Sequence, residues 1–190
     1  ARTMFLTEHG AQQATRPAVA AEHAAVFARA GVRSVADLGC GIGADSLEFA
    51  RASLATVSVE LDPLTASFAA ANLADFSGSR VVVGDVTNFN PESFRDSTGE
   101  AVQGIWLDPA RRDLTGVVKS RTERIFDPEA YSPPLSFVVD LARTGMPMGV
   151  KLGPGMPHEA IVRPEDIRSE ANPHPRITAQ WVEHEGSLVE

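Results

Sequence analysis

The sequence has one cysteine in 190 residues, at position 40, and no long run of apolar side chains. A single cysteine excludes an internal disulfide framework. No stretch approaches the roughly 20 consecutive apolar residues that cross a bilayer, and the first residues lack the apolar core of an export signal. The five histidines are scattered without metal-ligand spacing. We therefore expect a cytoplasmic protein with no metal and no membrane contact.

Positive charge is also scarce, because 17 Lys and Arg stand against 25 Asp and Glu, for a formal net charge of -8. Phosphate contacts need clustered Lys and Arg, so we do not expect this chain to hold a polyanion unaided. Only residues 111–124 are locally basic. The chain begins with Ala, and its last residues resemble the start of a strand, so we interpret it as part of a longer protein.

Short β-branched runs alternate with Ala-rich stretches, which is typical of βαβ units on a parallel sheet. The pattern predicts a helical lead-in over residues 1–30, with Thr15 as the cap of its helix and Gly31 as its end, and a core over residues 31–190. Strands are expected at 34–38, 55–61, 80–84, 102–107 and 148–152, a hairpin at 177–183 and 188–190, and helices at 44–52, 63–76 and 134–143. We therefore predict an α/β protein with a mostly parallel sheet.

A glycine-rich turn lies between the first strand and the next helix, in the segment VADLGCGIG. Its glycines are Gly39, Gly41 and Gly43. Glycine lets the backbone approach a ligand without a Cβ in the way, so the turn predicts a cofactor loop. A tight turn without a ligand needs less backbone freedom than this. With Ala44 and the acid Glu60, the same glycines also satisfy the G-x-G-x-x-G/A pattern of NAD-dependent oxidoreductases.

Acidic residues at strand ends favour S-adenosylmethionine over a dinucleotide. Asp37 would face a pyrophosphate as an unscreened like charge, but it suits the cationic amino group of a methionine moiety. Asp85 ends the third strand, where a carboxylate can accept a hydrogen bond from an adenine amino group. Asp108 and Pro109 follow the fourth strand, at the crevice where open sheets bind their substrates.

These segments resemble the class I S-adenosylmethionine-dependent methyltransferases. VADLGCGIG is similar to their first motif, VSVELDP to their post-motif acid, GDV to their adenine loop and LDP to their fourth motif. The resemblance implies a Rossmann-like, doubly wound, seven-stranded sheet in the order 3-2-1-4-5-7-6, with helices on both faces and the last strand truncated. It also implies Asp37 and the glycines around the methionine portion, Glu60 on the ribose hydroxyls, and Asp85 with Val86 at the adenine.

Further segments resemble the bacterial methyltransferases that carry a THUMP-like domain. These segments are WLDPARRD at 106–113, FLT at 5–7, QATRP at 13–17 and GVKLGP at 149–154. The resemblance implies a longer chain and, by analogy with THUMP-bearing tRNA enzymes, an RNA substrate bound through domains outside this chain. Our candidates for substrate contact are Gln13, Thr15, Arg111, Arg112 and Lys151.

The acceptor motif departs from the pattern of amino-directed methyltransferases, which follow the fourth strand with an Asp, Asn or Ser, two prolines and an aromatic. Here Ala110 replaces the second proline and Arg111 the aromatic. Base stacking would then come from the Arg111 guanidinium, Tyr131 or Trp106, although Trp106 is more simply interpreted as core. Uridine C5-methylation is excluded, because it needs a cysteine nucleophile and no cysteine follows position 40.

The predicted reaction is in-line methyl transfer to an RNA base nitrogen, with Asp108 and Pro109 as the catalytic pair. Asp108 would orient the acceptor or accept its proton. The arginines that follow could meet phosphate or pair with nearby acids, and Lys151 could pair with Asp108 or extend to solvent. Two alternatives stay open: an NAD-dependent oxidoreductase, and a non-catalytic module that binds the cofactor or RNA.

Overall fold

The computed structural model describes residues 4–6, 8–91, 93–111, 129, 131–153 and 156–189. The chain forms two compact units, Ala1–Asp108 with Pro147–Val150, and Pro109–Met146 with Lys151–Glu190. No helix in the described part of the chain is long and apolar enough to span a membrane. The division at residue 30 between lead-in and core stays a prediction.

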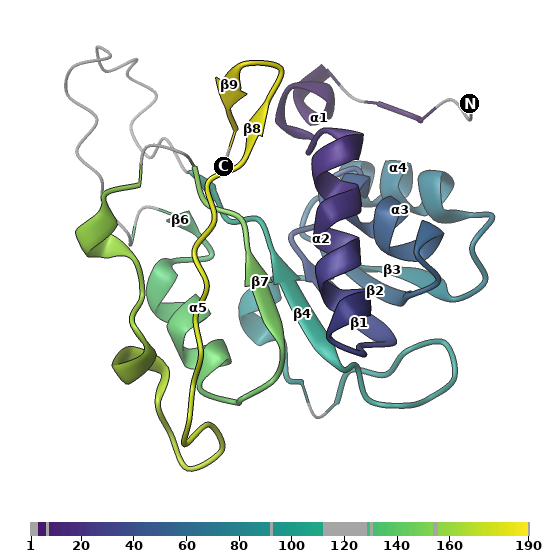
Figure 1. Ribbon diagram of the computed structural model, residues 1–190. Coiled ribbons are helices and arrows are strands. Elements are labelled where there is room, and N and C mark those ends of the chain that lie inside the picture. Colours follow the sequence, from purple (N-terminus) through teal and green to yellow (C-terminus); the bar gives the residue numbers. More distant parts are fainter. Residues whose placement is uncertain are drawn as a thin grey trace. The chain divides into compact units, whose positions relative to one another are not determined.

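The first unit is built on a parallel five-stranded sheet in the order β3-β2-β1-β4-β7 (Figure 1). The strands are β1 (Ser34–Leu38), β2 (Ala55–Glu60), β3 (Ser79–Val83), β4 (Gly104–Leu107) and β7 (Met148–Val150). Every residue of β1 and β4 is buried, as expected for inner strands of a parallel sheet. The predicted order of the first five strands is confirmed, and with it the α/β, Rossmann-like fold.

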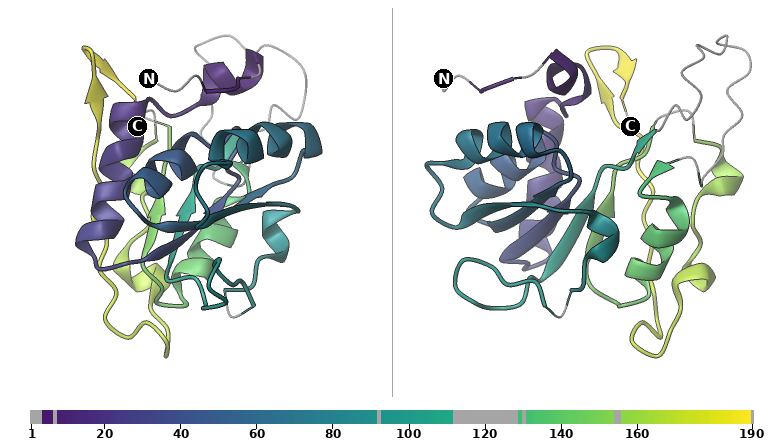
Figure 2. Two further views of the ribbon diagram at one scale, coloured as in Figure 1. Left: turned by 90° about the vertical axis from the view of Figure 1, so that its right-hand side faces the viewer. Right: turned by 180° about the vertical axis from the view of Figure 1, so that it is seen from behind.

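Three helices of the first unit lie in a row on one face of its sheet (Figure 2). They are α2 (Pro17–Arg29), α3 (Ala44–Arg51) and α4 (Pro63–Leu73); the short helix α1 (Glu8–Gln13) precedes them, and the 3-10 turn η1 (Val86–Asn88) follows β3. Pro17 begins α2 and Gly31, at a φ of +75°, follows its end, as predicted. The prediction that Thr15 caps α2 is wrong. The helix begins at Pro17, so Arg16 occupies the capping position, and the Thr15 hydroxyl is bonded to Asp45 instead.

An aromatic cluster fills the space between α2, α3 and the sheet. The rings of Phe27, Phe49 and Trp106 meet edge to face, with centroids 5.6 to 6.4 Å apart. Edge-to-face contacts of this kind add to the free energy gained by burying the rings. Trp106 is 5% exposed, so the structure places it in the core. Gly149 pairs with Trp106 across β4 and β7, and its missing side chain leaves room for the indole.

Gly149→Ala is expected to destabilise the protein by about 1–3 kcal/mol, because overpacking a dense core forces side chains from their positions. A Cβ at Gly149 would lie 2.7 Å from two carbons of the Trp106 ring. The control is Gly78→Ala, whose Cβ would come no closer than 3.7 Å to another atom. Urea unfolding measures both free energies. A loss for Gly149→Ala no larger than that for Gly78→Ala would contradict this account of the core.

The second unit contains short elements. They are β5 (Ala110–Arg111) paired with β6 (Tyr131–Ser132), α5 (Leu135–Ala142), the 3-10 helices η3 (His158–Ala160) and η4 (Pro164–Ile167), and the hairpin β8 (Glu183–His184) with β9 (Ser187–Leu188). Helix α5 confirms the helix predicted near Pro134.

The prediction that the C-terminal hairpin adds a sixth and a seventh strand to the main sheet is wrong for the described residues. The two strands of the hairpin pair only with each other and contain two residues each. Residues 177–182 form no strand, and within them Ile177 and Trp181 are 36% and 45% exposed. Alternating apolar residues form a strand only where a partner backbone accepts their hydrogen bonds.

Candidate functional site

The glycine turn joins β1 to α3, and its three glycines have left-handed backbone conformations. The φ angles of Gly39, Gly41 and Gly43 are +86°, +56° and +83°. A Cβ at either of the first two would have no atom within 4 Å, whereas one at Gly43 would lie 3.4 Å from Ala69 of α4. The first two glycines therefore leave open space beside the backbone, and the third allows close helix packing.

Glu60, at the end of β2, holds the glycine turn. The Gly41 N–H donates to its Oε2 atom at 3.0 Å, and the Asp62 N–H donates to Oε1 at 2.9 Å. The N–H groups of Gly39 and Cys40 both donate to the Val59 carbonyl. Each carboxylate oxygen of Glu60 has a second lone pair that can accept from a ligand hydroxyl. The structure thus brings the predicted ribose acid and the predicted cofactor loop together.

Cys40 within this turn is not a reactive thiolate. Burial raises the pKa of its thiol well above the ordinary value, and the carboxylates of Asp37 and Glu60 raise it further. A thiol that keeps its proton is a poor nucleophile. Cys40 therefore serves as a small side chain within the turn.

Asp37 is a buried acid on β1, with 1% of its surface exposed. The Ser46 hydroxyl of α3 donates to its Oδ2 atom, and the Ser46 and Ser58 hydroxyl oxygens lie 2.7 Å apart. Burial raises the pKa of Asp37 to about 8; the charges of Asp45 and Asp108 add to the shift and the hydrogen bond from Ser46 opposes it. Asp37 is therefore mostly protonated at neutral pH when no cation lies beside it.

Asp45, in the first turn of α3, joins the lead-in to the glycine turn. Its Oδ2 atom accepts from the Thr15 hydroxyl at 2.6 Å, and its Oδ1 atom lies 2.7 Å from Nδ1 of His23. The His23 ring lies on Trp106, with centroids 4.2 Å apart. Sequence reasoning missed Asp45 and His23, because neither belongs to a motif and their contact joins separate helices.

The carboxylate of Asp85 caps the 3-10 turn η1, which begins with Val86. Its Oδ1 atom accepts from the Thr87 N–H at 2.9 Å and from the Thr87 hydroxyl at 2.7 Å. Asp85 thus has a structural role of its own, and its contact with adenine stays a prediction. Leu61, which follows Glu60, is 55% exposed.

Asp108 follows β4 directly and is half-buried. Its charge acts on Asp37, so the structure brings these two predicted site residues together at one end of the sheet. Thr15 is 8% exposed, which makes it a buried anchor of the lead-in.

The other predicted substrate residues are spread over both units. Gln13 is exposed at the end of α1 in the first unit. In the second unit, Pro109 is buried, Lys151 is half-buried and Arg111 lies on β5 opposite Tyr131. Arg112 and most of the basic segment lie outside the described residues. Their roles stay predictions: substrate contact for Gln13, Lys151 and the two arginines, and catalysis for Pro109.

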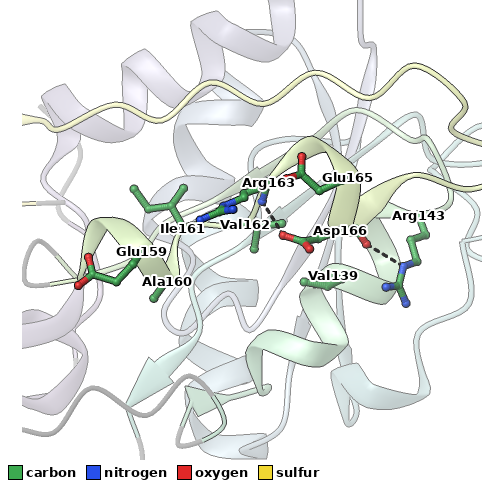
Figure 3. Close-up of a pocket in the computed structure, with 9 residues that line it drawn as sticks. All are labelled: Val139, Arg143, Glu159, Ala160, Ile161, Val162, Arg163, Glu165 and Asp166. Carbon is green, nitrogen blue, oxygen red and sulfur yellow. Dashed lines mark hydrogen bonds between the residues drawn. The ribbon is translucent and has the colours of Figure 1, made fainter.

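A hollow of about 650 Å³ lies in the second unit, beside α5 and the 3-10 helices η3 and η4 (Figure 3). It is lined by Val139, Arg143, Glu159, Ala160, Ile161, Val162, Arg163, Glu165 and Asp166. Arg143 donates to the Asp166 carbonyl at 3.0 Å, and the Asp166 carboxylate accepts from the Arg163 N–H at 2.8 Å. These bonds already use part of its polar lining, and none of the predicted site residues lines it.

Several methyltransferases are among the solved structures similar to this chain. One, from Pyrococcus horikoshii, is assigned as an RNA methyltransferase; it is 27% identical over 50% of this chain and 46% of its own, with a TM-score of 0.41. The aminopentose methyltransferase of calicheamicin biosynthesis from Micromonospora echinaspora is 21% identical over 56% and 44%, and an O-methyltransferase from Bacillus cereus is 17% identical over 50% and 46%; both have TM-scores of 0.42.

The match thus spans less than half of each of these structures. No protein-family model matches the sequence, and no curated protein matches it.

Proposed function

We propose that this chain is the cofactor-binding part of an S-adenosylmethionine-dependent methyltransferase that acts on a base nitrogen of RNA. The observation that carries the proposal is the set of carboxylates around the glycine turn. Glu60 is bonded to the turn, Asp37 is buried at its base, and Asp45 and Asp108 act electrostatically on Asp37.

The acids near the glycine turn favour a cation as its ligand. The charged groups that shift the pKa of Asp37 among the described residues are both carboxylates. A bound pyrophosphate would add two negative charges to this field, which is costly in a partly buried site. S-adenosylmethionine instead presents an ammonium and a sulfonium. The charge distribution therefore supports it over the NAD alternative.

The other parts of the cofactor are assigned to residues around the same turn. The open space beside Gly39 and Gly41 would receive the methionine and ribose portions, and Glu60 would accept hydrogen bonds from the ribose hydroxyls. Asp85 and Val86 would meet the adenine, with the exposed side chain of Leu61 as an apolar surface for the ring.

The bound cofactor would supply an electrophilic methyl group, and Asp108 would orient the acceptor. A carboxylate at this place can accept a hydrogen bond from an exocyclic amino group and take its proton as the nitrogen is methylated. Pro109 would hold the backbone that follows. An RNA acceptor is supported by the resemblance of WLDPARRD to THUMP-like methyltransferases; Arg111, Arg112, Lys151 and Gln13 are candidates for its contacts, while burial of Thr15 assigns it to the lead-in.

Isothermal titration calorimetry on this chain tests the cofactor. We expect S-adenosylhomocysteine, which keeps the ammonium and the nucleoside, to bind, and NAD not to bind at the same concentrations. Binding of NAD alone would overturn the proposal.

Asp108→Ala is expected to lower methyl transfer to RNA by about 100-fold or more, because general-base residues contribute about 10²–10⁴ to rates. The measurement is transfer of labelled methyl from S-adenosylmethionine to total RNA by the full-length protein. The affinity for S-adenosylhomocysteine should change only a few-fold, since Asp108 lies at the acceptor end. Equal labelling of RNA by both proteins would contradict the role of Asp108, and label appearing only in protein or small molecules would contradict the RNA acceptor.

A further inference from the structure

The side-chain amide of Asn72, in the last turn of α4, joins the N-terminal segment to the glycine turn. Its Nδ2 atom donates to the Ile42 carbonyl at 2.9 Å and to the Phe5 carbonyl at 3.0 Å. Its Oδ1 atom accepts from the Phe5 N–H at 2.7 Å. Ile42 lies between Gly41 and Gly43, so one amide bonds to the cofactor loop and to residue 5 at the same time.

The amide group of asparagine is suited to this arrangement. It has two N–H donors, which match the two carbonyls, and an oxygen that matches the one N–H. Aspartate would place an oxygen against both carbonyls, and alanine would leave all three backbone groups without this partner.

Two hydrogen bonds to Asn72 hold the backbone of Phe5. Phe5 and Leu6 are 56% and 52% exposed, so their side chains gain little from burial. The two bonds between Phe5 and Asn72 span 67 positions of the sequence. The place of this segment therefore depends strongly on Asn72.

The lead-in has a second attachment near the same turn. The Thr15 hydroxyl donates to Asp45, which lies two residues after Gly43. Residue 5 is thus attached beside the middle of the turn, and residue 15 is attached just beyond its end.

We propose that Asn72 is a positioning residue that couples the N-terminal segment to the cofactor loop. A cofactor that orders the loop around Ile42 then also orders residues 4–6, and an ordered segment strengthens cofactor binding. Such coupling is reciprocal, because each event changes the free energy of the other by the same amount. The inference rests on the proposed function, since it assigns the cofactor to this loop.

The test compares Asn72→Asp with the wild-type chain. We expect the Kd for S-adenosylhomocysteine to rise about tenfold, which corresponds to about 1.4 kcal/mol. Hydrogen exchange by NMR should show that the ligand slows exchange of the Phe5 amide in the wild type and does not slow it in the variant. Deletion of residues 1–7 should also raise the Kd, and the deletion combined with Asn72→Asp should raise it by less than the sum of the two single effects.

The matched control is Asn172→Ala in the second unit. Asn172 also donates its amide to two backbone carbonyls, those of Ala142 at 3.1 Å and Ile167 at 3.4 Å. Its loss should lower the melting temperature and leave the Kd unchanged, which separates positioning from a general loss of stability.

The possible outcomes of these measurements either support the coupling or overturn it. An unchanged Kd for a folded Asn72→Asp, or a Phe5 amide insensitive to ligand in the wild type, would overturn the coupling alone. A wild-type chain that binds no S-adenosylhomocysteine would overturn the proposed function and the coupling with it. If Asn72→Asp does not fold, the deletion variant makes the same test with Asn72 in place, and an unchanged Kd would again overturn the coupling.

Discussion

Asp37→Asn is expected to abolish S-adenosylhomocysteine binding, with a loss of at least 100-fold, and to raise the melting temperature of the empty protein. The loss follows because a buried charge pair with the ligand ammonium would be replaced by a neutral amide. The gain in stability follows because the variant no longer has a buried carboxylate that must either keep a proton or carry an unpaired charge.

The increase in stability should depend on pH in a defined direction. Asp37 has a pKa of about 8 in the folded chain, against an ordinary value of 3.8. The folded state therefore binds more protons than the unfolded state between these values, so wild-type stability falls as pH rises from about 4 to 8. Asparagine does not titrate. The difference in melting temperature should accordingly be small near pH 4, widen through neutral pH and level off above about pH 8.

Asp62→Asn is the control for the direction of this pH dependence of stability. Hydrogen bonds from the Thr65 hydroxyl and N–H lower the pKa of Asp62, which is fully exposed. A lowered pKa contributes stability that is lost only as pH falls, so the difference between this variant and the wild type should be constant above about pH 6. Melting curves by circular dichroism from pH 4 to 9 measure both variants. A difference for Asp37→Asn that stays constant over this range would contradict the raised pKa.

Ligand binding should also release a proton from the wild-type chain. An ammonium beside Asp37 favours the carboxylate, so binding at neutral pH ionises an acid that was mostly protonated. The apparent affinity then increases as pH rises toward 8. In calorimetry on the wild-type chain, the same coupling makes the observed enthalpy depend on the ionisation enthalpy of the buffer.

The parts of the fold predicted correctly are those that local pattern determines. Apolar strands, Ala-rich helices and the glycines between them repeat at short spacing, which is enough to place β1 to β4 and the cofactor turn. The missed contacts connect distant positions. Thr15 and Asp45 are 30 residues apart, and Phe5 and Asn72 are 67 apart. No local period encodes them, because they depend on how α2, α3 and α4 pack.

The C-terminal hairpin also shows the limit of predicting structure from local sequence pattern. The alternation in ITAQWVE predicts a strand, yet a strand exists only with a paired neighbour, and in the described residues only two pairs of residues form that ladder. Glu60 illustrates the reverse case. The position of Glu60 at the end of a strand was predictable from the sequence. Its bond to Gly41 could be seen only in the structure, where β1 pairs with β2.

Trp106→Ala is expected to destabilise the protein by about 3–5 kcal/mol, because it removes the ring on which Phe27, Phe49 and His23 pack. Trp106→Phe should cost less than Trp106→Ala, since it keeps an aromatic ring and leaves a smaller cavity. The substitution also removes a buried Nε1 that has no hydrogen-bond partner in the described part of the chain.

Urea unfolding of the two Trp106 variants distinguishes a core residue from a platform for an RNA base. If Trp106 is a core residue, Trp106→Phe keeps most of the stability and the cofactor affinity, and the main effect of Trp106→Ala is a loss of stability. If Trp106 is instead a stacking platform, Trp106→Ala leaves the chain stable and weakens RNA methylation. With the indole 5% exposed and Gly149 beneath it, the surface it offers to a base is too small for stacking, so we expect the first outcome.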